Sequence, residues 1–238
     1  MGSGIYVAVS GAVSQKQALD VIANNVANSG TVGFKAQRTA FETALKGEQT
    51  KELAFVGTAA TDTDSTAGNL IQTQNPLDLA LVGDGYFSVN TPRGVRYTRA
   101  GNFRLDPRGQ LVNGQGFAAR SSSGGAITVP TDAATIAIDA KGTVTADGEE
   151  VGQLALARVA STDLIREGAD LFGAKRTGGA VDASTEVVSG ALEGSNVNVV
   201  RGVVDLVQVS RTYEALMSMI EAYKAVDDRT ARSLGGPK

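Results

Sequence analysis

Both ends of this chain carry apolar residues at alternating steps of three and four, and this pattern constrains the fold more than any other feature. Near the N-terminus the positions are Ile5, Ala8, Ala12, Gln15, Leu19, Ile22 and Val26, all apolar except Gln15. Near the C-terminus they are Leu206, Val209, Tyr213, Leu216, Ile220 and Tyr223, and Asp227 ends the series. A period of about 3.5 residues is typical of a coiled-coil seam, but three heptads also suit an amphipathic helix packed on a globular core. In both cases a helix cannot bury its seam alone, so each needs a partner.

The residues between these two segments have a different pattern. Short alternating runs rich in Gly, Thr and Val are separated by turn signals at Asp84-Gly85, at residues 106–109 and at Asn113-Gly114. Such runs predict β-hairpins, and residues 106–109 (DPRG) have the preferences of a type I turn. The middle of the chain is therefore predicted to be an all-β domain inserted between two helices.

The expected fold class is α+β, with long N- and C-terminal helices and an all-β domain inserted between them; the family resemblance described below further implies that the helices pair as a coiled-coil-like inner domain and that the β domain is the outer one. The helices are expected over residues 5–28 and about 199–232. The polar, Thr-rich stretch 46–75 lacks periodicity and is expected to be extended. The predicted boundaries are 1–45 plus 190–238 for the helical domain with a linker to about 75, and 76–189 for the β domain.

Composition argues against most enzyme and binding classes. The 238 residues contain no Cys and no His, which excludes the common zinc sites and the Ser-His and Cys-His nucleophile pairs. The net charge of −3 leaves no basic surface for nucleic acid. The apolar run at 4–13 is not preceded by Lys or Arg and is too short to cross a membrane, so neither a cleaved signal peptide nor membrane insertion is expected. No catalytic residue, cofactor or metal site is predicted.

Asparagines cluster where the first helix should end and where the second should begin. Asn28 directly precedes Ser29-Gly30 and is expected to stop the first helix within its own chain. Asn24 and Asn25 lie too early for that task, and their amides, which carry both donors and acceptors, suit contacts to other backbones; with the family resemblance described below, we expect these contacts to lie between subunits. Asn196 and Asn198 are candidate N-caps of the second helix.

Four stretches of the sequence resemble the flagellar rod and hook proteins. Residues 23–42 (ANNVANSGTVGFKAQRTAFE) are similar to the family's N-terminal signature, in which the first helix ends in an asparagine run followed by a Thr-x-Gly-aromatic-Lys turn. Residues 75–89 and 97–117 resemble its central β motif, and residues 190–220 resemble its C-terminal helix motif. Together they cover more than half of the chain in the family's order. Within the family, the length and the VSRTYE stretch are most similar to proximal rod members, and distal rod members are the alternative.

The resemblance implies a structural subunit of the helical rod, the drive shaft that carries torque from the motor to the hook. In this family the terminal helices pair to form the inner domain, and the subunit leaves the cell through the flagellar export apparatus to assemble in the periplasm. The implied partners are copies of itself and neighbouring rod proteins. Residues Gly30, Val32, Arg201 and Gly202 depart from the family pattern, so rod-core contacts are not carried over at these four positions.

Combining the seams with the resemblance predicts a set of residues for helix packing and self-assembly. In the first helix and the turn after it they are Ile5, Leu19, Ile22, Asn24, Asn25, Val26, Asn28, Gly33 and Phe34. In the second helix they are Leu206, Val209, Tyr213, Leu216, Ile220 and Tyr223. Two other classes compete with this interpretation: a secreted β-domain enzyme working with two carboxylates, and a coiled-coil-tethered adhesin. The absence of Trp disfavours a sugar-binding platform.

Overall fold

The computed structural model describes residues 2–45, 54–182 and 184–234. The chain divides into two compact units. The helical unit comprises Met1–Ala27, Gln37–Asp62 and Asn198–Lys238, and the β unit comprises Asn28–Ala36 and Thr63–Val197. These boundaries differ from the expected ones, because residues 28–36, 63–75 and 190–197 group with the β unit.

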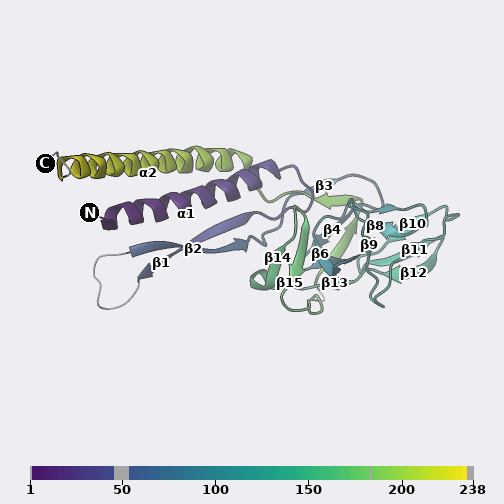
Figure 1. Cartoon of the computed structure of the whole chain (residues 1–238). Coiled ribbons are helices and arrows are strands. Elements are labelled where there is room, and N and C mark those ends of the chain that lie inside the picture. The colour runs from purple at the N-terminus through teal and green to yellow at the C-terminus, as the bar shows by residue number, and fades with distance from the viewer. Residues whose placement is uncertain (1, 46–53, 183, 235–238) are drawn as a thin grey trace. The chain divides into compact units, whose positions relative to one another are not determined.

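The helical unit is built from the two predicted helices and a pair of strands. The helices α1 (Gly2–Ala27) and α2 (Val199–Leu234) confirm the segments expected at 5–28 and 199–232. Strands β1 (Gln37–Leu45) and β2 (Ala54–Thr63) pair in a two-stranded sheet, seen below the helices in Figure 1. The extended linker expected from 46 to 75 therefore includes two strands, β2 and β3 (Leu70–Gln72), because pairing with β1 and with β17 (Ala191–Glu193) satisfies their backbone groups. The part of that linker at 46–53 lies outside the described residues.

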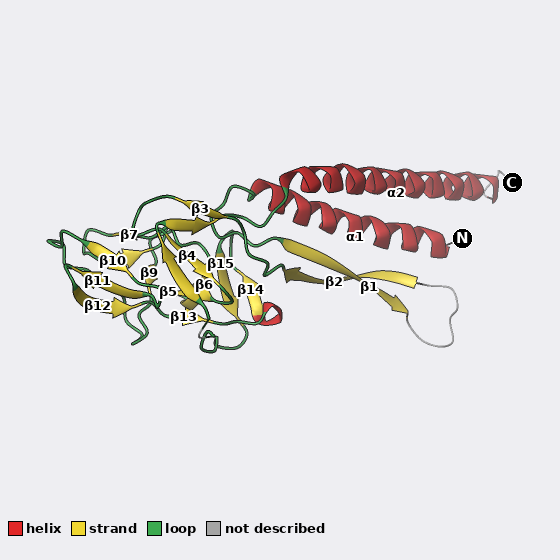
Figure 2. Ribbon diagram, turned by 180° about the vertical axis from the view of Figure 1, so that it is seen from behind, coloured by secondary structure: helices red, strands yellow, loops and turns green. Residues whose placement is uncertain are grey.

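The β unit contains the remaining strands and one short 3-10 helix, η1 (Ser161–Asp163), shown in Figure 2. The strands are β3 (Leu70–Gln72), β4 (Leu79–Val82), β5 (Tyr86–Thr91), β6 (Gly94–Thr98), β7 (Arg104–Leu105), β8 (Leu111–Val112), β9 (Ala118–Ala119), β10 (Ile136–Ile138), β11 (Thr143–Ala146), β12 (Glu149–Gln153), β13 (Leu156–Ala157), β14 (Leu164–Arg166), β15 (Leu171–Ala174), β16 (Glu186–Ser189) and β17 (Ala191–Glu193). The largest sheet has the order β14-β15-β6-β5-β9-β8-β7, with β13 also paired to β5. Smaller sheets are β10-β11-β12, β16-β4 and β17-β3, and all the registers are antiparallel.

The core of the β unit lies on both faces of β5. Phe87 and Val89 are fully buried in the main apolar cluster, where the ring of Phe87 meets that of Phe103 edge to face at 5.3 Å. The opposite face places Tyr86 in a second cluster with Phe172, their ring centroids 5.8 Å apart. Because successive side chains of a strand point to opposite faces, the uninterrupted YFSV run indicates a strand covered on both sides.

The predicted turns are largely confirmed. Gly109 N–H donates to Asp106 O at 2.9 Å, which closes the expected turn at 106–109. Asn113 opens the hairpin between β8 and β9, where Gly116 N–H donates to Asn113 O at 2.9 Å. Residues 79–82 and 86–91 are strands as predicted, but they do not pair with each other across Asp84-Gly85. Instead β4 pairs with β16, from far along the chain, and β5 forms a hairpin with β6, the strand that follows it.

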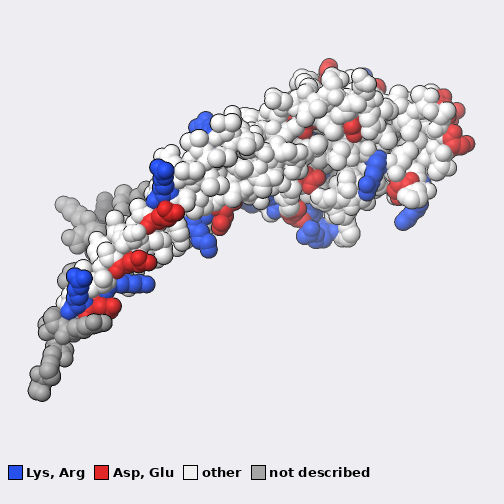
Figure 3. Space-filling view, turned by 90° about the horizontal axis from the view of Figure 1, so that it is seen from above, with Lys and Arg blue, Asp and Glu red and all other residues white. Residues whose placement is uncertain are grey.

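The surface carries both signs of charge. On the face shown in Figure 3, Lys and Arg side chains lie interspersed with Asp and Glu, in keeping with the net charge of −3. Among the described residues, neither α1 nor α2 combines the length and the apolar character that a membrane-spanning helix requires.

Candidate assembly interface

The two terminal helices pack against each other in antiparallel orientation. A Cβ built at Gly4 would lie 3.0 Å from Tyr223 Oη, and one built at Gly11 would lie 3.5 Å from Leu216 Cδ1. At the other end of α1, a Cβ built at Gly202 would lie only 2.7 Å from Val26 Cγ2. Glycine at these positions therefore allows the helices to approach closely along the whole length of α1.

Burial along the helices follows the predicted seams. A small core forms where Ala8, Ala12 and Ile220 are buried, with Ile5, Tyr213 and Leu216 packed around it. Other predicted seam residues are half-buried, namely Leu19, Ile22, Val26, Leu206 and Val209, whereas Tyr223 is 38% exposed. The seam thus identifies the face along which the helices meet, and α2 beyond this face is mostly exposed.

Asparagine side chains mark the ends of both helices. Asn198 caps α2, because its Oδ1 accepts a hydrogen bond from Arg201 N–H at 3.0 Å. Asn28 directly follows the last residue of α1, and its Oδ1 accepts from the Thr31 hydroxyl at 3.2 Å. Asn196, the other expected cap, is not one: its amide pairs with segments of the β unit described below.

Asn25 has a role within its own chain that the sequence did not reveal. Its Nδ2 donates to Gln37 O at 2.8 Å, and its Oδ1 accepts from Gln37 N–H at 2.9 Å. Both polar ends of the amide therefore hold the first residue of β1 against α1. Asn24 is exposed on the same helix, where a contact between subunits stays a prediction.

We expect Asn25→Ala to lower the free energy of unfolding of the helical unit by about 1–2 kcal/mol, because two backbone groups of Gln37 lose their partner. Thermal unfolding followed by circular dichroism measures this loss. Gln17→Ala, an exposed change on the same helix, is the control and should be nearly neutral. Unchanged stability combined with failed assembly would instead assign Asn25 to a contact between subunits.

The segment after α1 makes a tight turn into the β unit. Gly33 adopts φ of +67°, and a Cβ built there would lie 2.2 Å from Ala100 N. Its N–H donates to Glu193 O at 2.7 Å. The following Phe34 is fully buried, with the Arg166 guanidinium 4.6 Å from its ring centroid. Through these contacts, Gly33 and Phe34 pack the turn after α1 into the β unit.

Next to this turn lies a buried cluster of charged groups. Lys35 Nζ contacts Glu193 Oε1 at 2.6 Å, and Arg99 Nη1 contacts Glu193 Oε2 at 3.1 Å. All three side chains are at most 5% exposed. Burial lowers the pKa of Lys35, and the attraction of Glu193 opposes that shift. The single carboxylate of Glu193 therefore pairs with two buried positive charges. Without it, both Lys35 and Arg99 would be buried with no counter-charge from Glu193.

Backbone and amide groups complete the cluster. Asn196 Oδ1 accepts from Ala36 N–H at 2.7 Å, and its Nδ2 donates to Asp64 O at 3.0 Å. Lys35 Nζ also donates to Thr66 O at 2.6 Å. Arg166 donates to Lys35 O and lies between the rings of Phe34 and Phe172. The turn after α1 and the segment before α2 are therefore tied together within the β unit.

Lys35 belongs to the Thr-x-Gly-aromatic-Lys turn of the family signature, but the sequence did not predict its burial, and it did not single out Arg99, Glu193 or Arg166. The available signal was weak: an isolated Lys, Arg or Glu is usually solvated, and nothing in the local sequence marks these as buried. The partners Lys35 and Glu193 are 158 residues apart, so no spacing rule links them.

Both helices also expose large apolar side chains. On α1 they are Tyr6, Val7, Val9 and Val13, and on the first turns of α2 they are Val199, Val200, Val203, Val204 and Val207. Soluble monomers rarely leave apolar side chains contiguous on one surface. These residues point to an interface that the single chain does not fill.

Comparison with known proteins decides the family. Residues 5–35 match the model described as flagella basal body rod protein, residues 80–146 the flagellar hook protein FlgE/F/G D1 domain, and residues 188–233 the flagellar basal body rod FlgEFG protein C-terminal region. The flagellar basal-body rod protein FlgF of Escherichia coli K12 is 34% identical, over 98% of this chain and 97% of that protein. The chain belongs to the flagellar basal-body rod protein family.

Other relatives agree with this assignment. FlgF of Rhizobium meliloti is 29% identical over the full length of both chains, and the rod protein FlgG of Bacillus subtilis is 32% identical over 91% of this chain and 93% of its own. This rod protein is therefore a structural subunit of the bacterial flagellar basal-body rod. Its three matched regions meet in the buried cluster, since Lys35, Arg99 and Glu193 each come from a different one.

Proposed function

We propose that this rod protein is a subunit of the proximal rod and polymerises helically through its terminal helices. The observation that carries the proposal is the pair of apolar surfaces left exposed on α1 and α2 after the helices have packed on each other. Burying them against neighbouring subunits would supply the free energy of assembly, at about 25 cal/mol for each Å² of apolar surface removed from water.

The helix pair is proposed to act as a coiled-coil-like inner domain. Support comes from the 3.5-residue seam, whose members, apart from Tyr223, are buried or half-buried on both helices. Antiparallel packing along the whole of α1 would give a stiff element, suited to a shaft that carries torque from the motor to the hook.

The proposed partners are copies of this chain and neighbouring rod proteins, including the distal rod protein. In this proposal the subunit passes through the flagellar export apparatus and assembles in the periplasmic part of the basal body. It has no enzymatic activity, no cofactor and no nucleic-acid ligand. Similarity to FlgF over the full length of both chains supports the proximal position, and similarity to FlgG makes the distal position the alternative.

Purification of basal bodies from flagellated cells tests the proposal. An epitope-tagged copy should co-sediment with the basal body, and electron cryo-microscopy should place its density in the proximal rod. Density in the distal rod would select the alternative. Absence of the tagged chain from basal bodies that are otherwise complete would refute a rod function.

A further inference from the structure

Two exposed apolar stripes lie on the helical unit, one on each helix. The Tyr6 stripe consists of Tyr6, Val9 and Val13 on α1, and the valine stripe consists of Val200, Val203, Val204 and Val207 on α2. Each follows helical spacing of three, four and seven, so each forms one continuous band on its helix. Tyr6 is 64% exposed and Val200 is 77% exposed, so neither stripe is covered by its own chain.

The two stripes lie at opposite ends of the helix pair. Gly4 lies against Tyr223 and Val26 lies against Gly202, so the Tyr6 stripe is near the C-terminal half of α2 and the valine stripe is near the end of α1. The valine stripe ends at Val207, and the part of α2 that lies beside Tyr6 is about fourteen residues further along the helix. At the rise of an α-helix this separation is ~20 Å. The stripes of one chain therefore do not meet, whereas those of two successive copies can.

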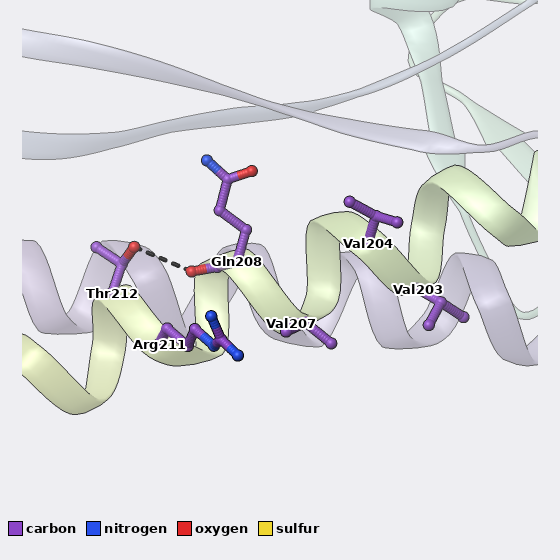
Figure 4. Close-up of a pocket in the computed structure, with 6 residues that line it drawn as sticks. All are labelled: Val203, Val204, Val207, Gln208, Arg211 and Thr212. Carbon is purple, nitrogen blue, oxygen red and sulfur yellow. Dashed lines mark hydrogen bonds between the residues drawn. The ribbon is translucent and has the colours of Figure 1, made fainter.

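The valine stripe borders a hollow that suits an aromatic side chain. This hollow has a volume of about 480 Å³ and is lined by Val203, Val204, Val207, Gln208, Arg211 and Thr212. Figure 4 shows the valines on the first turns of α2, followed by the polar side chains on the next turns. Thr212 already donates its hydroxyl to Gln208 O at 3.0 Å.

Tyrosine matches this lining in chemistry. Its ring would bury apolar surface against the valines, and its hydroxyl could pair with the amide of Gln208. Arg211, at the polar end, offers a guanidinium that can lie over the ring face. An aromatic anchor in an apolar pocket with a polar rim is the usual centre of a protein interface.

We propose that Tyr6 of one copy enters the α2 hollow of the next copy, so that the Tyr6 stripe and the valine stripe of successive subunits pack together. The inference rests on the proposed polymerisation and names the surfaces that carry it. Because the two surfaces are different and lie at opposite ends of the helix pair, the contact is head to tail, and a head-to-tail contact whose rotation does not close builds a helical polymer such as a rod.

Disulfide cross-linking tests the contact directly, because the chain contains no cysteine. Two differently tagged full-length chains, Tyr6→Cys and Val207→Cys, replace the native copy in flagellated cells, which are then oxidised. We expect a disulfide-linked heterodimer of the two chains. The chain carrying both substitutions should form a ladder of oligomers instead of an internal bond, since its two cysteines are too far apart to bridge.

Controls separate this contact from chance collisions. Gln17→Cys, exposed on the same face of α1 but eleven residues or about 16 Å beyond Tyr6, should give at most background product with Val207→Cys. Without cysteines, Tyr6→Ala should lower incorporation into basal bodies at least about tenfold, as for the loss of an anchoring side chain, and Tyr6→Phe should retain most of it.

Equal cross-linking from Gln17 and from Tyr6, or products dominated by Tyr6–Tyr6 or Val207–Val207 pairs, would overturn the inference. So would normal incorporation of Tyr6→Ala. In these cases the native chain would still be found in basal bodies and the rod function would stand. Absence of the native chain from basal bodies would instead refute the rod function itself.

Discussion

Gly33→Ala is expected to prevent the β unit from reaching its native packing. The added Cβ would lie 2.2 Å from Ala100 N and 2.3 Å from the carbonyl carbon of Arg99, and both are backbone atoms that cannot move aside. The residue would also have to hold φ of +67°, which L-residues with a Cβ disfavour. Together these effects should cost at least about 4 kcal/mol, a loss found only for the most disruptive single substitutions.

Denaturant unfolding and hydrogen exchange of amides in β5 and β8 measure this loss. Gly30→Ala is the matched control, three residues earlier, because Gly30 is exposed and a Cβ built there meets nothing within 4 Å. If both variants unfold at the same denaturant concentration, the turn at Gly33 is not the constraint that its geometry indicates.

Glu193→Gln should have the second-largest effect, lowering the free energy of unfolding of the β unit by about 3–5 kcal/mol. The reason is that Lys35 and Arg99 would stay buried without their counter-charge. Asp205→Asn is the control, because Asp205 pairs with Arg201 at 3.9 Å on the surface and should contribute less than about 1 kcal/mol. A double variant that also carries Lys35→Met should recover part of the loss, since one unpaired charge is removed.

The loss caused by Glu193→Gln should depend on pH in a defined direction. Burial already lowers the pKa of Lys35, and removing the opposing attraction of Glu193 lowers it further. A lysine whose folded pKa is depressed destabilises the fold at all pH values below that pKa. The loss is relieved as the pH rises through the folded pKa toward the unfolded value of about 10.4.

Unfolding of this variant in urea between pH 7 and pH 10 should therefore show the deficit relative to the native chain becoming smaller. A deficit that stays constant or grows with pH would mean that the Lys35 charge is not its cause.

A structural feature of this protein could be predicted from the sequence when the residues that determine it lie close together in the chain. The helices could be predicted because their apolar residues repeat at a spacing that is visible within a few helical turns. The seam residues Ile5 on α1 and Ile220 on α2 lie on the side of each helix that faces the other helix. The turn at 106–109 was predictable because Asp, Pro and Gly each favour one position of it. The resemblance of the termini and the β motif was likewise a property of contiguous stretches, and the family comparison confirmed it.

Other features depended on residues far apart in the chain. Asn25 was expected to act between subunits, but the strand at Gln37 lies within reach of its amide only once β1 packs on α1. Asn196 had the sequence position of a helix N-cap, but its side-chain oxygen instead accepts a hydrogen bond from Ala36 N–H, in the segment after Phe34. Similarly, the strands flanking Asp84-Gly85 do not pair with each other, because β4 pairs with the distant strand β16 and β5 pairs with β6.

The two helices, the β-rich middle and the family therefore follow from local sequence, because periodicity and turn chemistry act over a few residues. Which polar groups are buried together and which apolar groups stay exposed depends on how distant segments pack. Lys35 meets Glu193 across 158 residues, and Arg99 meets it across 94. Tyr6 and Val203 read as ordinary helix residues until the packing of α1 on α2 leaves them facing water. Burial is a property of the whole fold, so no local pattern can assign it.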